Sequence, residues 1–302
     1  MEKGRCKVSI IIPHYNQTEF LKICLPSITN QTYQEYEVII IDDCTRNPSV
    51  VPLIETLIEN HQNVLLVRNE KNMRFIKTVN KGIKLAKGKY VCLLNCDTKV
   101  ANNFIEKNVE ILDSDDSIAG LSCTIVDKYG NNWWSGGAFK AGFPVNLTDD
   151  FVGIRPVDFI AGTSAFYRKQ VFDEIGLFDE SYRMYHEDVE FGLRIRTETN
   201  YQVCAFSDKL VIHYGLSSIP GAEISYLGNR NHILMVRKYF PDSVLSVVLQ
   251  SFAEKAISLV KDILGLHPWL FRFHLVGLVG TLAGLCKCRA SEASQFKIRV
   301  ND

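Results

Sequence analysis

The sequence has no excess of charge of either sign. Its 34 lysines and arginines balance 34 aspartates and glutamates over 302 residues. Bulk binding to nucleic acid needs a basic excess, so no nucleic-acid partner is expected. The nine cysteines include no C-x-x-C pair. An odd number of cysteines without regular spacing excludes a disulfide framework and favours reduced thiols in the cytoplasm.

Long hydrophobic runs are also missing. The uninterrupted apolar stretch of the C-terminal part, Leu275–Cys286, has 12 residues, whereas a membrane-spanning helix needs about 20. Near the start, the short apolar run before Pro13 is typical of a first strand rather than of a signal peptide. We expect residues 264–286 to contact a membrane interface or to pack on the rest of the chain. The protein is then cytoplasmic, and at most peripheral at the inner face of the cell membrane.

The first hundred residues alternate between apolar strands and helices. Strands are predicted at residues 7–12, 37–41, 64–67 and 90–94, with helices at 19–30, 50–60 and 75–86. This alternation predicts an α/β fold, a mostly parallel, Rossmann-like sheet with helices on both faces. The pattern changes after residue 100, and residues 226–302 are expected to form a C-terminal helical extension to a catalytic unit of residues 1–225.

Polar side chains follow three of these strands. His14, Tyr15 and Asn16 come after the first, Asp43 after the second, and Asn95 and Asp97 after the fourth. The carboxyl ends of parallel strands meet at one edge of a sheet, where ligands bind. Oxygen ligands from Asn95 and Asp97 suit a hard divalent cation, which in turn suits a diphosphate. Taken alone, the triplet is also compatible with a polar turn or a helix cap.

The chain resembles the family 2 glycosyltransferases over roughly residues 7–240. Three segments carry the resemblance, in the family's order: VSIIIPHYNQTEFLKICLPSITNQTYQEYEVIIIDD, NKGIKLAKGKYVCLLNCDTKV and FIAGTSAFYRKQVFDEIGLFDESYRMYHEDVEFGLRIR. The resemblance implies a GT-A fold, a nucleoside-diphosphate sugar as donor, inversion at the anomeric carbon, and Mg²⁺ or Mn²⁺ as cofactor. Within the family, the chain looks most like rhamnosyltransferase-type enzymes of bacterial surface polysaccharide. The implied donor is dTDP-rhamnose or a UDP-sugar, and the acceptor a glycan or a polyprenyl-linked glycan.

The resemblance also implies how the donor is held. Asp97, Asn95 and His213 match positions that bind the metal, which would bridge the two donor phosphates. The positions matching contacts to the rest of the nucleotide sugar are Pro13, Tyr15, Asn16, Asp43, Arg74, Asn95 and Arg230. Arg74 stands where the family often has glycine. Alternatively, Asp43 forms an Asx turn, Arg74 is solvated, and His213 is a buried structural histidine.

Asp188 matches the general base, which takes the proton of the acceptor hydroxyl, and Glu187 would orient or support it. Both carboxylates also suit a helix start for structural reasons. Trp133 and Trp134 are candidates for a platform under the acceptor sugar, or for simple packing. Gly162 and Thr163 would lie beneath the acceptor, because glycine permits close approach.

Two other readings of the sequence stay open. A nucleotidyltransferase would have a similar sheet but usually carries a glycine-rich, basic phosphate loop after the first strand, where this chain has PHYNQTEF. The other reading is a non-catalytic carbohydrate- or partner-binding protein on a degenerate transferase fold. Asn95 and Arg74 favour it, whereas Asp97, Asp188 and His213 argue against it.

Overall fold

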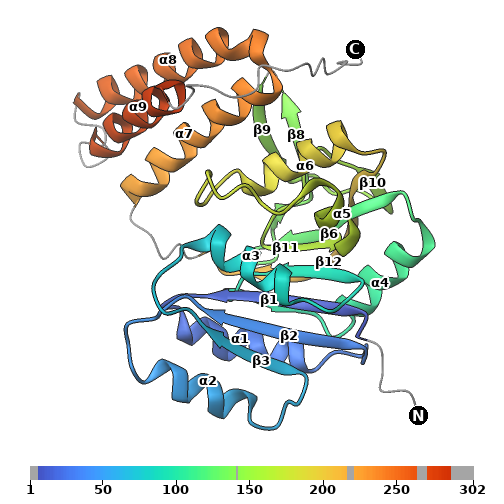
Figure 1. The fold of residues 1–302 in the computed structure, drawn as a ribbon. Helices are drawn as coiled ribbons and strands as arrows, with labels where there is room; N and C mark the ends of the chain where they lie inside the picture. The colour runs from blue at the N-terminus through green and yellow to red at the C-terminus, as the bar shows by residue number, and fades with distance from the viewer. Residues whose placement is uncertain (1–5, 141, 216–220, 264–270, 287–302) are drawn as a thin grey trace.

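The structure, a computed structural model, describes residues 6–140, 142–215, 221–263 and 271–286. Its centre is one large sheet, with the strand order β10-β12-β6-β11-β4-β1-β2-β3 along its main path (Figure 1). The bounds of these strands are β1 (Val8–His14), β2 (Tyr36–Asp42), β3 (Val64–Arg68), β4 (Tyr90–Leu94), β6 (Ile118–Val126), β10 (Ile154–Pro156), β11 (Ser164–Arg168) and β12 (Gln202–His213).

The first half of the sheet is parallel, as predicted. Strand β1 pairs in parallel with both β2 and β4, and β2 pairs with β3. Helices α1 (Thr18–Thr29) and α2 (Val50–Ile58) lie on one face and α3 (Phe75–Leu85) on the other (Figure 1). Strands covered on both faces need apolar side chains throughout, which explains the continuous runs in the sequence. The α/β class and the placement of helices on both faces are confirmed.

The second half of the sheet is mixed. Strand β11 lies antiparallel between β4 and β6, and β6 pairs in parallel with β12. Short β5 (Thr98–Val100) pairs with β12, and β7 (Asn132–Trp134) with β6. Helix α4 (Phe104–Ser114) lies between β5 and β6 in the chain. A separate hairpin of β8 (Gly136–Lys140) and β9 (Phe143–Leu147) follows β7. Helices α5 (Lys169–Ile175) and α6 (Glu187–Glu198) precede β12.

Three helices follow the sheet: α7 (Gly221–Tyr239), α8 (Val244–Ile263) and α9 (Phe271–Cys286). The expected boundary between residues 225 and 226 falls inside α7, which runs unbroken. Helix α9 packs closely on α7 through small residues. A Cβ at Gly284 would lie 2.7 Å from the carbonyl oxygen of Arg230, and one at Gly280 would clash with that of Tyr226. The glycines of α9 therefore allow the two helices to touch.

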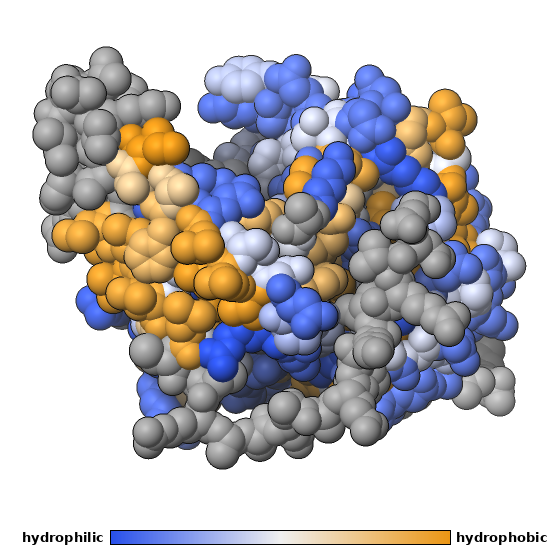
Figure 2. All heavy atoms as spheres, turned by 90° about the horizontal axis from the view of Figure 1, so that it is seen from above, coloured by the Kyte–Doolittle hydropathy of each residue, from blue (hydrophilic) through white to orange (hydrophobic). Residues whose placement is uncertain are grey.

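The outer side of this helical layer is apolar. Figure 2 shows a large hydrophobic region at the left of this view. Six large hydrophobic side chains of α8 and α9 are exposed: Leu245, Leu249, Ile257, Leu275, Val279 and Leu282. No helix within the described residues is both long and apolar enough to cross a membrane. Residues 264–270 of the predicted interface segment lie outside the described residues.

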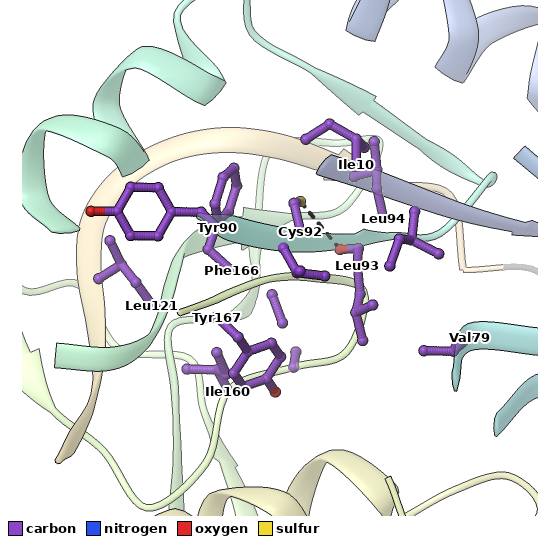
Figure 3. Packing of buried hydrophobic residues seen from close by; sticks show 14 of the residues in the cluster. Ile10, Val79, Tyr90, Cys92, Leu93, Leu94, Leu121, Ile160, Phe166 and Tyr167 are labelled. Carbon is purple, nitrogen blue, oxygen red and sulfur yellow. Dashed lines mark hydrogen bonds between the residues drawn. The ribbon is translucent and has the colours of Figure 1, made fainter. Parts of the chain in front are cut away.

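The main core lies where β1, β4 and β11 meet (Figure 3). Ile10, Leu94 and Phe166 are completely buried there. Since β4 is held between β1 and β11, its carboxyl end, where Asn95 and Asp97 follow, has a fixed place at the sheet edge.

Candidate active site

Asp97 and His213 meet at the end of β4. Strands β5 and β12 pair with His213 opposite Thr98, and this register brings the His213 Nε2 atom to 3.3 Å from Asp97 Oδ2. Both side chains are about nine-tenths buried. The other ring nitrogen of His213, Nδ1, has no hydrogen-bond partner among the described residues. The two residues that the resemblance implied as metal ligands therefore lie in direct contact, and their binding of a metal stays a prediction.

A metal at this point would need further ligands. Among the described residues, no cluster of three or more His, Cys, Asp or Glu side chains is arranged to hold an ion. Asn95 is two residues from Asp97, and its backbone carbonyl accepts a hydrogen bond from Thr98 Oγ1 at 2.7 Å. An aspartate oxygen, an amide oxygen and a histidine nitrogen form a donor set that Mg²⁺ or Mn²⁺ accepts, provided that ligand oxygens complete it. The residues thus fit a metal ion whose coordination is completed by oxygens of a bound ligand, rather than a site made of protein groups alone.

The two tryptophans of β7 have different environments. The ring of Trp133 lies edge-on to His213, with centroids 4.5 Å apart, and 37% of the residue is exposed. Trp134 is completely buried, because neighbouring residues of a strand point to opposite faces. The prediction that Trp134 contacts the acceptor is therefore wrong. Trp133 remains beside the proposed metal ligands.

Asp43, the candidate base-binding residue, holds a loop. Its carboxylate accepts hydrogen bonds from Asn69 Nδ2 at 2.8 Å, from the Met73 amide at 2.7 Å and from the Arg74 amide at 2.9 Å. It is almost completely buried. These three donors fix the loop of residues 69–74, which precedes α3. None of these donors is the nearby backbone amide that an Asx turn uses, so Asp43 holds a distant loop instead. A contact with the base stays a prediction.

The other candidate nucleotide contacts differ in exposure and in backbone conformation. Pro13 and Tyr15 are half-buried at the end of β1. Asn16 is exposed, has a positive φ of 60°, and donates its amide to Thr45 Oγ1 at 3.1 Å. Arg74 also has a positive φ, 68°, and its exposed guanidinium forms an ion pair with Glu223 of α7.

Arg230 does not lie where the resemblance implied. It is only 3% exposed, and its Nη1 atom donates to the carbonyl of Ser181 at 3.1 Å. Burial lowers its pKa below the usual arginine value. A guanidinium with so little accessible surface cannot reach a diphosphate, so the prediction is wrong. In this structure Arg230 supports the loop before α6.

Glu187 and Asp188 begin α6 in a buried environment. Asp188 Oδ2 accepts a hydrogen bond from the Gly162 amide at 3.0 Å, and Oδ1 accepts one from the Val189 amide at 2.8 Å. Burial raises the pKa of Asp188. Burial, with the added charge of Asp188, raises the pKa of Glu187 to about 8. Two adjacent acids with raised pKa values are typical of proton-transfer sites.

The turn before α6 is conformationally strained. Arg183, Tyr185 and His186 have φ angles of 63°, 67° and 65°, a region that residues other than glycine rarely adopt. Asn231 of α7 holds the turn by donating Nδ2 to the carbonyls of Tyr182, Met184 and Tyr185 at 2.7–2.8 Å. Asn231 is not among the site residues predicted from the sequence, although it is the next residue after Arg230.

Backbone contacts join these groups into one site. The Asn95 amide donates to the Thr163 carbonyl at 2.9 Å, and Gly162, next in the chain, donates to Asp188. A Cβ at Gly162 would lie 3.6 Å from Asp188, so the glycine gives only a little extra room. The predicted residues Asn95, Thr163, Gly162 and Asp188 thus form a continuous path from the end of β4 to the start of α6.

Comparisons with known proteins agree with this architecture. Residues 9–176 match the model of glycosyl transferase family 2. The uncharacterised glycosyltransferase YwdF of Bacillus subtilis is 30% identical over 195 residues, 62% of this chain and 67% of that protein. The O-antigen biosynthesis protein RfbC of Myxococcus xanthus is 25% identical over 249 residues, 76% of this chain and 19% of that protein.

Solved structures show the same fold. That of GalNAc-T7 with UDP, GalNAc and Mn²⁺ superimposes with a TM-score of 0.65 at 20% identity, covering 80% of this chain and 49% of that one. The chain spans between 35% and 56% of the length of the curated relatives that it matches first. The likeness therefore defines the fold, while activity and substrates need their own argument.

Proposed function

The chain belongs to glycosyl transferase family 2, and we propose that it is an inverting hexosyltransferase that uses a nucleoside-diphosphate sugar. One observation carries the proposal. Buried Glu187 and partly buried Asp188 are joined through Gly162, Thr163 and Asn95 to the strand end at which Asp97 meets His213. A proton acceptor next to a diphosphate site is the arrangement that sugar transfer requires.

Asp188 is the proposed general base. As the acceptor oxygen attacks the anomeric carbon, its O–H bond breaks and the proton passes to an Asp188 oxygen. The bond from that carbon to the donor diphosphate breaks at the same time, and the nucleoside diphosphate leaves with the bonding electrons. A direct displacement of this kind inverts the anomeric centre. The amides of Gly162 and Val189 orient the carboxylate before the attack.

Glu187 is proposed to keep a proton while Asp188 is charged. Its pKa of about 8 leaves it mostly neutral at pH 7, because two adjacent buried carboxylates do not both ionise easily. A neutral Glu187 offers an O–H group that can donate to the acceptor sugar. Its Oε2 atom is buried and has no hydrogen-bond partner among the described residues, so its hydrogen-bonding capacity is unused in the described part of the chain.

Asp97, Asn95 and His213 are the proposed ligands of Mg²⁺ or Mn²⁺. Such an ion would neutralise the charge that builds on the leaving diphosphate. The solved structure of GalNAc-T7, named as containing UDP, GalNAc and Mn²⁺, supports both the donor class and the metal. Pro13, Tyr15 and Asp43, with Asn16 and Arg74, are proposed to contact the nucleotide.

We assign the reaction to cell-surface polysaccharide synthesis. Similarity to an O-antigen biosynthesis protein and the rhamnosyltransferase-like motifs support a donor such as dTDP-rhamnose or a UDP-sugar, and a glycan or polyprenyl-linked acceptor. The exposed apolar side chains of α8 and α9 support a cytoplasmic enzyme that touches the membrane face where lipid-linked acceptors lie. Trp133, Gly162 and Thr163 are proposed to border the acceptor.

Thermal unfolding with UDP, dTDP, GDP and CMP, each with and without Mn²⁺, tests the donor site. A nucleotide at 100 times its dissociation constant stabilises a fold by about 2.7 kcal/mol. We expect one pyrimidine diphosphate to stabilise the chain more strongly with Mn²⁺ than without it, and Asp97→Asn to remove that difference. If no nucleotide stabilises the chain, the proposal is wrong and a glycan-binding role on a degenerate transferase fold replaces it.

A further inference from the structure

A basic cavity lies between the end of β3 and helix α3. Its volume is about 550 Å³, within the range of small-molecule sites. Five of its lining side chains are cationic: Arg68, Lys71, Lys77, Lys81 and Lys84. Neither of the proposed catalytic carboxylates, nor Asp97, lines it. The cavity is therefore distinct from the site that carries the chemistry.

Helical spacing gathers three of these cations. Lys77, Lys81 and Lys84 are four and three residues apart on α3, so they share one side of the helix. The apolar side chains of Ile76 and Ile83 on the same helix are buried. The packing of α3 on the sheet thus turns the lysines toward the edge strand β3, whose last residue is Arg68.

Some of the cations are held in place by neighbours. Lys81 Nζ donates to Asn69 Oδ1 at 2.7 Å. Arg68 Nε lies 3.3 Å from Asp42 Oδ2. Lys77 Nζ lies 3.7 Å from Glu180 Oε2. These contacts fix positive groups around the cavity before any ligand arrives, which lowers the entropy lost on binding.

The cavity keeps an excess of positive charge. Glu70 and Glu180 are the anionic residues in its lining, against five cations. In the described part of the chain, the Lys71 and Lys84 amines make no side-chain hydrogen bond or ion pair, and both residues are exposed. The whole chain has a net charge of zero, so this concentration of cations is local. Several ammonium groups around one cavity match a ligand with several charged oxygens.

We propose that this basic cavity binds a soluble phosphate-bearing molecule, with a diphosphate group as the part that it recognises. Asn69 connects it to the donor region, because the same amide side chain accepts from Lys81 and donates to Asp43. The ligand would therefore bind next to the loop that Asp43 holds, outside the proposed catalytic groups. The inference does not depend on the proposed sugar transfer.

Titration calorimetry of the full chain with inorganic pyrophosphate, in EDTA, tests this proposal. EDTA removes metal-dependent binding at Asp97, so the basic cavity is measured by itself. We expect saturable binding that weakens as salt is added, and a loss of about tenfold in affinity for the double variant Lys71→Glu, Lys84→Glu. Lys71→Gln, Lys84→Gln, with half the change in charge, should show a smaller loss.

Two controls make the result specific. Lys128→Glu, Lys140→Glu changes the net charge equally at exposed lysines that do not line the cavity, and it should bind pyrophosphate like the parent chain. Asp97→Asn should also bind unchanged. The proposal is overturned if the parent chain does not bind, if both glutamate double variants weaken binding equally, or if Asp97→Asn alone abolishes it.

Discussion

Adjacent Glu187 and Asp188 differ in what stabilises their charge. Burial raises the pKa of both acids. Asp188 receives the Gly162 and Val189 amides, and these bonds favour its charged form. Glu187 faces the charge of its neighbour in addition to burial. The shared proton therefore resides on Glu187, and Asp188 is the member of the pair that can accept a proton from an acceptor hydroxyl.

Replacing Asp188 by Asn should slow sugar transfer by about 10²–10⁴-fold, the usual contribution of a positioned base. Asn keeps the size of the side chain and can still accept from the Gly162 amide. Nucleotide-dependent stabilisation in thermal unfolding should therefore be unchanged. The measurement is the initial rate of transfer from the nucleotide sugar that the unfolding screen identifies. Transfer at the parental rate would show that another group is the base.

The raised pKa of Glu187 predicts a pH-dependent stability. In the folded chain its pKa is about 8, against an ordinary value of 4.5. Between these values the folded state keeps a proton that the unfolded chain has lost, so the free energy of unfolding falls as pH rises. His186, whose pKa burial lowers to about 3 from 6.5, has the opposite effect, which is complete only about one pH unit above 6.5.

Urea unfolding at about pH 7.5 and at about pH 8.5, compared with the same measurement on Glu187→Gln, isolates the glutamate, because what remains of the His186 contribution in that interval is the same in both proteins. We expect the parent chain to lose stability across it, and Glu187→Gln, which cannot ionise, to lose less. Equal slopes for the two proteins would mean that Glu187 is charged throughout and that the assignment of the proton is wrong.

At the scale of elements, α7 builds the turn that delivers the carboxylate pair to the site. Asn231 uses one amide group for three carbonyls of the turn, and Arg230 adds the carbonyl of Ser181. Because residues 183, 185 and 186 have unfavourable positive φ angles, these bonds are needed to hold the turn. The start of α6 thus depends on a helix that comes after the last strand.

Asn231→Ala should destabilise the fold by about 1–3 kcal/mol, because it leaves buried carbonyls without donors. Transfer should slow as the start of α6 loosens. Asn229→Ala is the matched control, since Asn229 donates to the Ser225 carbonyl of its own helix at 2.7 Å, and it should cost about 1 kcal/mol or less. Equal urea midpoints for the two variants would contradict the proposal that Asn231 holds the turn before α6.

Alternation along β7 separates the two tryptophans. Trp134→Ala removes a completely buried ring and should cost about 3–5 kcal/mol in urea unfolding. Trp133→Ala should cost less than about 1 kcal/mol, and should raise the KM for the acceptor while leaving nucleotide binding intact. An unchanged acceptor KM would limit Trp133 to its contact with His213.

The sequence predicted best where local pattern and position agree. Apolar runs predicted the parallel strands, and the polar residues that end the fourth led to Asp97. His213, which the resemblance implied, lies in contact with Asp97. Prediction from the sequence failed where packing between distant elements decides. Nothing local distinguishes exposed Trp133 from buried Trp134 until the pairing of β7 with β6 is known. Likewise, Arg230 and Asn231 point into the fold because of where α7 docks, which their own segment does not specify.

At the scale of the molecule, the helical layer is fixed to the sheet domain by polar contacts and to itself by close packing. Completely buried Glu190 of α6 accepts from Lys238 at 2.8 Å and from the Tyr239 hydroxyl at 2.7 Å, both on α7. Helix α9 then lies on α7 through its glycines. This order leaves apolar side chains of α8 and α9 facing outward (Figure 2).

That outward face should bind a lipid surface. Leu245 and Leu249, 70% and 60% exposed, are one helical turn apart on α8, and Leu282 of α9 is half exposed. Each Leu→Gln change removes about 1–2 kcal/mol of apolar burial in an interface. We expect the full chain to float with vesicles of phosphatidylcholine and phosphatidylglycerol, and the triple glutamine variant to stay in solution.

The control for this prediction changes exposed apolar residues elsewhere. Val152 and Ile154, 97% and 49% exposed, precede and begin β10, away from the helical layer (Figure 1). Val152→Gln, Ile154→Gln should float like the parent chain, and both variants should keep nucleotide-dependent stabilisation, because neither touches the strand ends that hold the donor. Flotation of the triple variant, or a parent chain that stays in solution, would refute lipid contact. If the face does bind lipid, the three glutamines should leave transfer to a water-soluble acceptor unaffected. Transfer to a lipid-linked acceptor in vesicles should fall with the loss of binding.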